Sequence, residues 1–163
     1  MSLLTEEVRA WIGKEAVYTA PEPLGRAGIR YFALAIGDDN PIYVDDEAAR
    51  AAGYDGVVAP PTLICETNQY VTGARGADGL LAHWWDIPVE SARPVRGGNE
   101  YTFHRPVRPT DVITATWRIA DISEREGSDG APMLVVRSEA TYTNQEGELL
   151  ATNTETIIYR GSS

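Results

Sequence analysis

Apolar residues in the first half of the chain recur at helical spacing. Over residues 25–36, apolar side chains stand at positions 29, 32, 33 and 36, which predicts a helix with one buried stripe. Gly37 suits the C-terminal end of this helix, because glycine readily adopts the left-handed conformation found there. Similar patterns predict three more helices, at 5–14, 45–52 and 62–72. The last of these has few charges, so we expect it to be mostly buried.

The second half of the chain changes to the pattern of strands. Alternating and β-branched residues predict four consecutive strands, at 99–107, 111–122, 132–144 and 149–159. A short strand is also expected at Val17 and Tyr18, and residues 74–98 form an irregular excursion with a strand or loop inside it. Helices followed by strands indicate an α+β fold with an antiparallel meander. Such a sheet buries one face, and the helix at 62–72 is the best candidate to cover it.

Length and composition limit the classes of function. The chain has 163 residues, so we expect a single domain over 1–163. No apolar run approaches the roughly 20 residues that cross a bilayer, and the N-terminus lacks the basic start of a signal peptide. We therefore expect a cytoplasmic protein. The net charge of −10 argues against nucleic acid or an anionic membrane as the general partner, because both favour a basic surface. With one cysteine and two histidines, a metal site is not expected.

Three segments carry motifs whose order along the chain is informative. Residues 37–43 are Gly-Asp-Asp-Asn-Pro-Ile-Tyr, residues 56–63 are Gly-Val-Val-Ala-Pro-Pro-Thr-Leu, and residues 101–113 contain Arg-Pro-Val followed by Pro-Thr-Asp. From about residue 8 to residue 160, the chain resembles the MaoC-like hydratases of the hot-dog superfamily. The N-terminal type of MaoC domain is the most similar, including the non-catalytic-type subunits of mycobacterial fatty-acid dehydratases and steroid enoyl-CoA hydratases. The resemblance implies a single hot-dog domain, in which an antiparallel sheet wraps around a central helix.

The resemblance also implies a reaction, the addition of water to a trans-2-enoyl thioester or its reversal. The expected substrate is an acyl-CoA, and no separate cofactor is expected. This chemistry needs a base, an acid and N–H donors that stabilise the enolate oxygen. By the same resemblance, Asp38 and Tyr43 occupy the catalytic positions of the family. Substrate binding is assigned to Asn40, Pro61, Thr62, Leu63, Arg105 and Arg108.

Two positions depart from the pattern of the active relatives. Tyr43 stands where those relatives have the catalytic histidine, and a tyrosine with a pKa of about 10 is a poor base at neutral pH. We interpret Tyr43 as a packed aromatic residue with a hydrogen-bonded hydroxyl. Pro61 stands where they usually have a glycine whose N–H points at the thioester oxygen, and proline has no N–H. The donor would then be displaced to Thr62 or Leu63, or be absent.

Other reactive or charged side chains have plain structural interpretations. Asp38 could equally be a turn residue at the end of a helix. His104 follows Tyr101 and Phe103 on a predicted strand and should face away from them, so we interpret it as a structural or surface residue. Cys65, in an apolar helix, is interpreted as a core thiol. Further candidates without a geometric argument are His83 and the pair Trp84 and Trp85, which could line an acyl pocket, form an interface or pack in the core.

Four arginines are close together in sequence within this acidic chain, at positions 93, 96, 105 and 108. One or more could bind the phosphates of coenzyme A, or they could be solvated ends of strands.

Three hypotheses follow for function. The first is a subunit of an enoyl-thioester hydratase or 3-hydroxyacyl dehydratase, which shapes the acyl pocket while a related hot-dog partner supplies the Asp–His pair. A homo- or hetero-oligomer is expected in that case, because hot-dog sheets leave an edge that pairs with a second domain. The second is a self-sufficient hydratase that uses Asp38. The third is a non-enzymatic protein that binds acyl thioesters.

Overall fold

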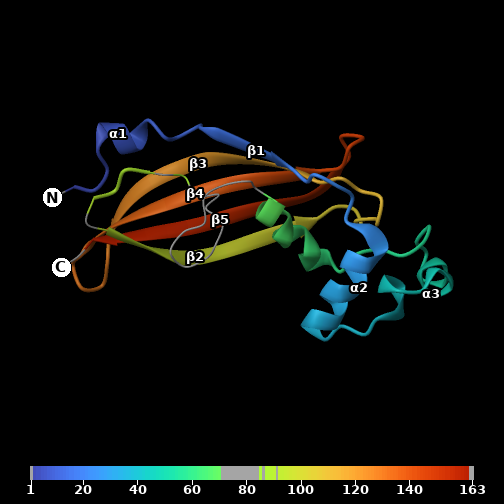
Figure 1. Ribbon diagram of the computed structural model, residues 1–163. Helices are drawn as coiled ribbons and strands as arrows, with labels where there is room; N and C mark the ends of the chain where they lie inside the picture. The colour runs from blue at the N-terminus through green and yellow to red at the C-terminus, as the bar shows by residue number, and fades with distance from the viewer. Residues whose placement is uncertain (1, 71–84, 86, 91, 162–163) are drawn as a thin grey trace.

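The computed structural model describes residues 2–70, 85, 87–90 and 92–161. A five-stranded antiparallel sheet has the order β1-β3-β4-β5-β2 (Figure 1). Its strands are β1 (Glu15–Thr19), β2 (Ala92–Phe103), β3 (Thr114–Glu126), β4 (Pro132–Thr143) and β5 (Leu149–Gly161). The α+β class is therefore confirmed. The predicted four-strand meander is wrong in one respect, because β2 pairs with β5 rather than with β3, its neighbour in sequence.

The connection after β2 explains this pairing. Residues 104–113 cross the end of the sheet instead of making a tight hairpin, and the backbone N–H groups of His104 and Arg105 both donate to the Leu150 carbonyl. β2 begins at Ala92, inside the segment expected to be irregular. A bulge between Arg96 and Gly98 interrupts its register, and edge strands commonly accommodate such irregularities. A side chain at Gly97 would start only 2.9 Å from Thr156 Cγ2, so this position suits glycine.

The helices agree with the predicted positions but differ in extent and type. They are α1 (Glu6–Arg9), α2 (Gly25–Ile36) and α3 (Asp46–Ala51), with two 3-10 helices, η1 (Pro41–Tyr43) and η2 (Pro61–Tyr70). The expected helix at 5–14 ends early, because the Gly13 N–H donates to the Ile119 carbonyl and ties the chain to the sheet. The helix expected at 62–72 is the 3-10 helix η2, and residues 71–72 lie outside the described part of the chain.

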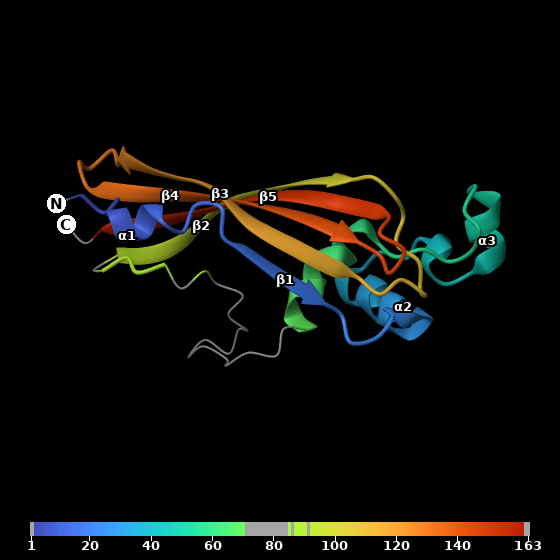
Figure 2. The same ribbon diagram turned by 90° about the horizontal axis from the view of Figure 1, so that it is seen from above.

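The central helix η2 lies against the concave face of the curved sheet (Figure 2). Leu63 and Ile64 at its start are buried in one core cluster with Trp117 of β3 and Tyr142 of β4. The helix therefore covers the sheet, as the sequence predicted. In both views α2 and α3 lie at one end of the sheet and the chain termini at the other (Figures 1 and 2). The three motifs meet at the end where α2 and α3 lie.

Candidate functional site

The first motif forms a sequence of turns at the end of α2. Gly37 has a φ of 71°, which is the left-handed conformation expected of a helix-ending glycine. The Asp38 N–H donates to the Ala33 carbonyl at 2.9 Å, and an Asp38 carboxylate oxygen accepts the Asn40 N–H at 3.1 Å. The Asn40 side-chain oxygen in turn accepts the Ile42 N–H at 3.2 Å and caps η1. Both polar side chains therefore stabilise the turn in addition to any role toward a ligand.

Tyr43 is a buried residue of the same motif. Its side chain is only 7% exposed. Burial raises the pKa of Tyr43 above its usual value, and the charge of Asp38 and a side-chain hydrogen bond with it raise the pKa further. The hydroxyl thus stays protonated at neutral pH. This is the packed tyrosine expected from the sequence.

A cavity of about 230 Å³ adjoins Tyr43 and brings the three motifs together. Its lining residues are Ile42, Tyr43, Tyr54, Val58, Ala59, Pro61, Phe103, His104, Arg105, Pro106 and Val107. Backbone hydrogen bonds join its walls, from the Val58 N–H to the Ile42 carbonyl and from the Ala59 N–H to the Val107 carbonyl. Tyr43, Pro61 and Arg105 from the predicted site all line this cavity. Asp38, Asn40, Thr62 and Leu63 are not among its lining residues.

The start of η2 determines which backbone donors face the cavity. Pro61 lines the cavity and cannot donate. Leu63 is buried in the core, and its N–H donates to the Pro60 carbonyl at 2.9 Å, so this donor is already used inside the protein. Thr62 is exposed. The backbone N–H groups of Thr62 and Leu63 were the two expected replacements for the missing glycine N–H. Because the Leu63 N–H is already used, Thr62 is the remaining candidate.

His104 lies in the same cavity wall as Tyr43, which sequence reasoning missed. The residue is exposed, as expected. Its imidazole contacts Thr152, which pairs with Thr102, whereas Phe103 pairs with Ala151. His104 therefore faces away from Phe103, as the alternation predicted, although β2 itself ends at Phe103. Its Nε2 lies 3.4 Å from Thr152 Oγ1, a long hydrogen bond. His83 and Trp84 lie outside the described residues.

The remaining sequence candidates lie in the core. Trp85 packs against both core clusters, and its indole N–H donates to Ser138 Oγ at 3.0 Å. Cys65 is half-buried against the first cluster and is hydrogen-bonded to the Tyr101 hydroxyl. Burial, the largest cause, raises the pKa of Tyr101 well above its usual range. Within the described part of the chain, no cluster of metal-ligand side chains is present, and no helix is long and apolar enough to span a membrane.

The clustered arginines separate into two groups in space. Arg93 and Arg96 lie on the edge strand β2, where Arg96 is 3.6 Å from the buried Glu155. Arg105 and Arg108 line a second cleft of about 460 Å³, together with Arg26 of α2. This cleft shares Tyr54, Val58, Arg105 and Pro106 with the cavity beside Tyr43. An apolar cavity and an arginine-lined cleft therefore adjoin at the expected substrate site.

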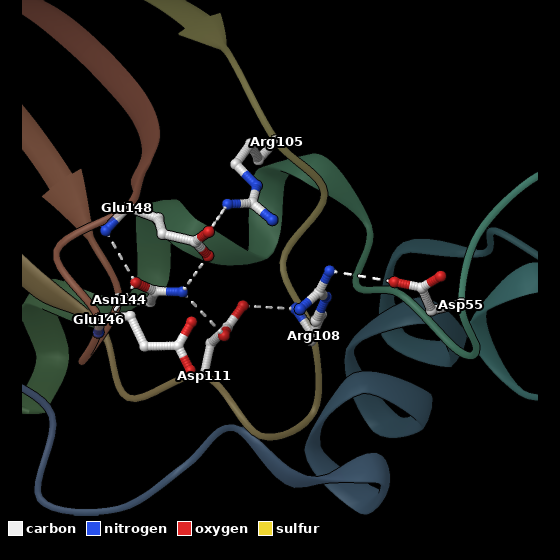
Figure 3. Close-up of polar contacts among 7 residues, drawn as sticks. All are labelled: Asp55, Arg105, Arg108, Asp111, Asn144, Glu146 and Glu148. Atoms are coloured by element: carbon white, nitrogen blue, oxygen red, sulfur yellow. Dashed lines mark hydrogen bonds and ion pairs between the residues drawn. The ribbon is translucent and has the colours of Figure 1, made fainter.

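A buried polar network supports the two arginines that follow β2 (Figure 3). Arg105 pairs with Glu148, which accepts a hydrogen bond from the Asn144 side chain at 2.9 Å. The same amide of Asn144 reaches Asp111 at 3.4 Å, and Asp111 accepts the Arg108 backbone N–H at 2.8 Å. Asp111 and Asn144 are 3% and 5% exposed. Arg105, followed by Asn144, lowers the pKa of Glu148.

A curved antiparallel sheet over a central helix, with an aspartate-bearing turn beside a cavity at the start of that helix, defines a hot-dog domain of the dehydratase type. Residues 10–153 match the family model described as the FAS1-like dehydratase domain region. The chain belongs to this family.

Proteins of similar sequence span nearly the same length. The UPF0336 protein of Saccharopolyspora erythraea is 36% identical over 155 residues, which cover 95% of this chain and 92% of that protein. The UPF0336 protein MT0525.1 of Mycobacterium tuberculosis is 32% identical over 155 residues, with 94% of this chain and 86% of that protein covered. The similarity therefore concerns whole domains and is not limited to the motifs.

Solved structures agree with the fold. The ChsH1–ChsH2 complex of Mycobacterium tuberculosis contains a chain with a TM-score of 0.74 and 25% identity, covering 94% of this chain and 88% of that one. The C-terminally truncated HadBC complex, a (3R)-hydroxyacyl-ACP dehydratase of the same organism, gives a TM-score of 0.64 and 28% identity, with 89% and 96% covered. The MaoC-like dehydratase of Rhodospirillum rubrum, at 20% identity, shares the fold with a TM-score of 0.64 and coverage of 93% and 94%.

Proposed function

We propose that the protein is a subunit of an enoyl-thioester hydratase, or of a 3-hydroxyacyl dehydratase in the reverse direction. In this proposal it shapes the acyl pocket, and a related hot-dog partner supplies the aspartate–histidine pair. The substrate is an acyl thioester, with coenzyme A as the expected carrier. The observation that carries the proposal is the buried Tyr43, which lines the cavity where active relatives place a base and whose pKa is raised by burial and by Asp38.

The chemistry of the reaction explains why this arrangement favours a pocket role. Hydration joins a water oxygen to C3 of the enoyl group and a proton to C2, so a base must take a proton from the water. Tyr43 is protonated and cannot do this. The enolate oxygen also needs a donor. Pro61 has no N–H and the Leu63 N–H is used by the Pro60 carbonyl, so the exposed Thr62 is the candidate donor that remains at the start of η2. The apolar cavity, by contrast, remains suited to an acyl chain.

Two observations support a hot-dog partner. β2 is a 12-residue edge strand of the sheet and pairs with β5, and an edge of such length is a surface for further pairing. The similar chains in the ChsH1–ChsH2 and HadBC structures are also found in complexes. We infer that this protein assembles in the same general way, as a homo- or hetero-oligomer.

The decisive test compares the chain alone with the chain in a complex. The purified protein, and the protein co-purified with a hot-dog subunit that has the complete Asp–His motif, are assayed with crotonyl-CoA and a long trans-2-enoyl-CoA. Loss of the conjugated thioester absorbance reports hydration. We expect no turnover by the folded chain alone and turnover by the complex. When a pocket residue such as Val58 is replaced by Phe, the ratio of the hydration rates of the two substrates should change. An unchanged ratio in an active, folded variant complex would contradict the pocket role.

A second candidate is a self-sufficient hydratase, and one observation favours it. His104 is among the residues that line the same cavity as Tyr43. In that case the chain alone is active, and Asp38→Asn and His104→Gln each abolish the turnover. The non-enzymatic alternative, a protein that only binds acyl thioesters, instead requires thioester binding without turnover by the chain or by any complex that contains it.

A further inference from the structure

The three arginines of the 460 Å³ cleft differ in how firmly they are held. Arg26 Nη1 contacts both carboxylate oxygens of Asp46 at 3.0 Å. Asp46 also accepts the Val57 N–H at 3.0 Å. Arg26, followed by that N–H, lowers the pKa of Asp46. Arg26 is thus part of a connection between α2, α3 and the second motif.

Arg105 is held in a comparable way. Its partner Glu148 is fixed by Asn144, which also binds the backbone N–H groups of Glu146 and Glu148 in the turn between β4 and β5. The Arg105–Glu148 pair therefore joins the segment after β2 to that turn (Figure 3). Moving this guanidinium toward a ligand would break a network whose centre, Asn144, is buried.

Arg108 combines a fixed backbone with a replaceable side-chain partner. Its N–H donates to the buried Asp111 at 2.8 Å, which fixes where the side chain begins. Its guanidinium contacts Asp55 at 3.2 Å, and the Asp55 side chain is 91% exposed (Figure 3). A surface pair of this kind contributes little to stability, so an anion can replace the carboxylate at small cost. A phosphate suits this position because arginine binds it with two parallel N–H donors.

The charged side chains of the cleft leave one arginine open to a ligand. Arg26, Arg105 and Arg108 each pair with a carboxylate, and the partner of Arg108 is the exposed Asp55, which an anion can replace. The cleft adjoins the apolar cavity through shared residues, among them Tyr54 and Pro106. A ligand with an acyl group in the cavity would therefore extend its carrier arm toward Arg108.

We propose that Arg108 is the carrier-binding residue of the site, which exchanges Asp55 for a phosphate on the pantetheine arm of the thioester, while Arg105 and Arg26 hold the walls of the cleft. This inference rests on the proposed function and deepens it. The 4′-phosphate of pantetheine occurs both in coenzyme A and in acyl carrier proteins, so the shared chemistry is this phosphate. Asp55 acts as a competitor for the same guanidinium.

The test measures the binding affinity of three thioesters by calorimetric titration into the complete protein at low salt. The probes share the crotonyl group and differ in the carrier: crotonyl-pantetheine, crotonyl-4′-phosphopantetheine and crotonyl-CoA. We expect the phosphorylated probes to bind about 10–100-fold more tightly than crotonyl-pantetheine, the range of one charge-assisted contact. Arg108→Gln should remove most of this difference, whereas Asp55→Asn should raise the affinity for the phosphorylated probes several-fold. The matched control is Arg93→Gln, because Arg93 is an exposed residue of β2 outside the cleft. This substitution should leave the affinities for the three probes unchanged.

The outcomes separate this inference from the proposed function. Equal affinity of crotonyl-CoA and crotonyl-4′-phosphopantetheine assigns the contact to the 4′-phosphate, and a tighter crotonyl-CoA adds contacts to its nucleotide phosphates. Both results support the proposal if Arg108→Gln removes the advantage. If all three probes bind with equal affinity, or if Arg108→Gln does not change the affinities, the assignment of Arg108 is wrong. The proposed function as a hydratase subunit is not affected by this result. Failure of the folded protein and of its complex to bind any probe overturns both.

Discussion

Replacing Tyr43 by histidine should give the chain the base that its motif lacks. Tyr43 is 7% exposed, and Asp38 is close enough to raise the pKa of its hydroxyl. A histidine at this position would place its imidazole on the cavity side of the same carboxylate. Aspartate beside imidazole is the pair that active relatives are expected to use. The prediction is therefore a gain of hydratase activity in the chain alone.

The expected gain follows from the two defects of the site. A positioned general base contributes about 10²–10⁴-fold to a rate. The missing donor at Pro61 removes about 10²–10³-fold, so Tyr43→His alone should give only a small gain and Pro61→Gly should add to it. The cost in stability should be about 1–3 kcal/mol, because the smaller ring incompletely fills a buried position and the proline is lost from a rigid segment. Such a loss leaves most domains folded.

The assay is hydration of crotonyl-CoA by the chain alone, followed by the loss of thioester absorbance. Tyr43→Phe is the matched control, because it retains an aromatic ring but supplies no base, and it should stay at background. The gain in Tyr43→His with Pro61→Gly should disappear when Asp38→Asn is added. It should also fall as the pH drops below about 6.5, where the imidazole becomes protonated. A folded double variant without activity, yet with normal thioester binding, would refute the idea that position 43 faces the reacting carbon.

Three further predictions concern the buried polar groups. Burial raises the pKa of Glu155, with Arg96 partly opposing, so the folded protein binds this proton more tightly than the unfolded chain. Stability should therefore fall as the pH rises from 4.5 through the raised pKa, and Glu155→Gln should flatten this dependence in urea denaturation at pH 5 and pH 8. Asn144→Ala should cost about 1–3 kcal/mol in the same assay by leaving buried partners unsatisfied. Trp85→Phe should lower the free energy of unfolding by about 1–2 kcal/mol, because Ser138 loses its indole donor. An unchanged urea midpoint would show that this hydrogen bond does not stabilise the fold.

Local patterns predicted the fold because the elements carry their own signals. The stripe at 29, 32, 33 and 36 gave α2, and Ile29 and Ala33 are its buried residues. Alternation gave β3, β4 and β5, which pair in sequence order. The partner of β2 was not predictable in this way, because it depends on a connection that crosses the end of the sheet. Alternation along a strand specifies its faces, and it does not specify the neighbouring strand.

The candidate site was predicted in part for the same reason. The Gly-Asp-x-Asn-Pro motif located the turn, and the absent histidine suggested a packed Tyr43, which is what the structure has. The strand that carries His104 was predicted to extend to residue 107, but β2 ends at Phe103. Arg105 is fixed through Glu148 and Asn144, whereas Arg108 pairs with Asp55. These partners are distant from the arginines in sequence. No local pattern contains such information.

The cavity beside Tyr43 favours a ligand-binding role for this domain over a purely structural role. Protein interiors are closely packed, and a cavity that serves no purpose costs stability. Here the walls at Val58 and Ala59 are held open by backbone hydrogen bonds to Ile42 and Val107. In the proposed function, Tyr43 and Pro61 lack the base and the donor of the active pattern, and both residues still line the cavity. A chain that retains the pocket without the base is what a division of labour between two hot-dog subunits requires.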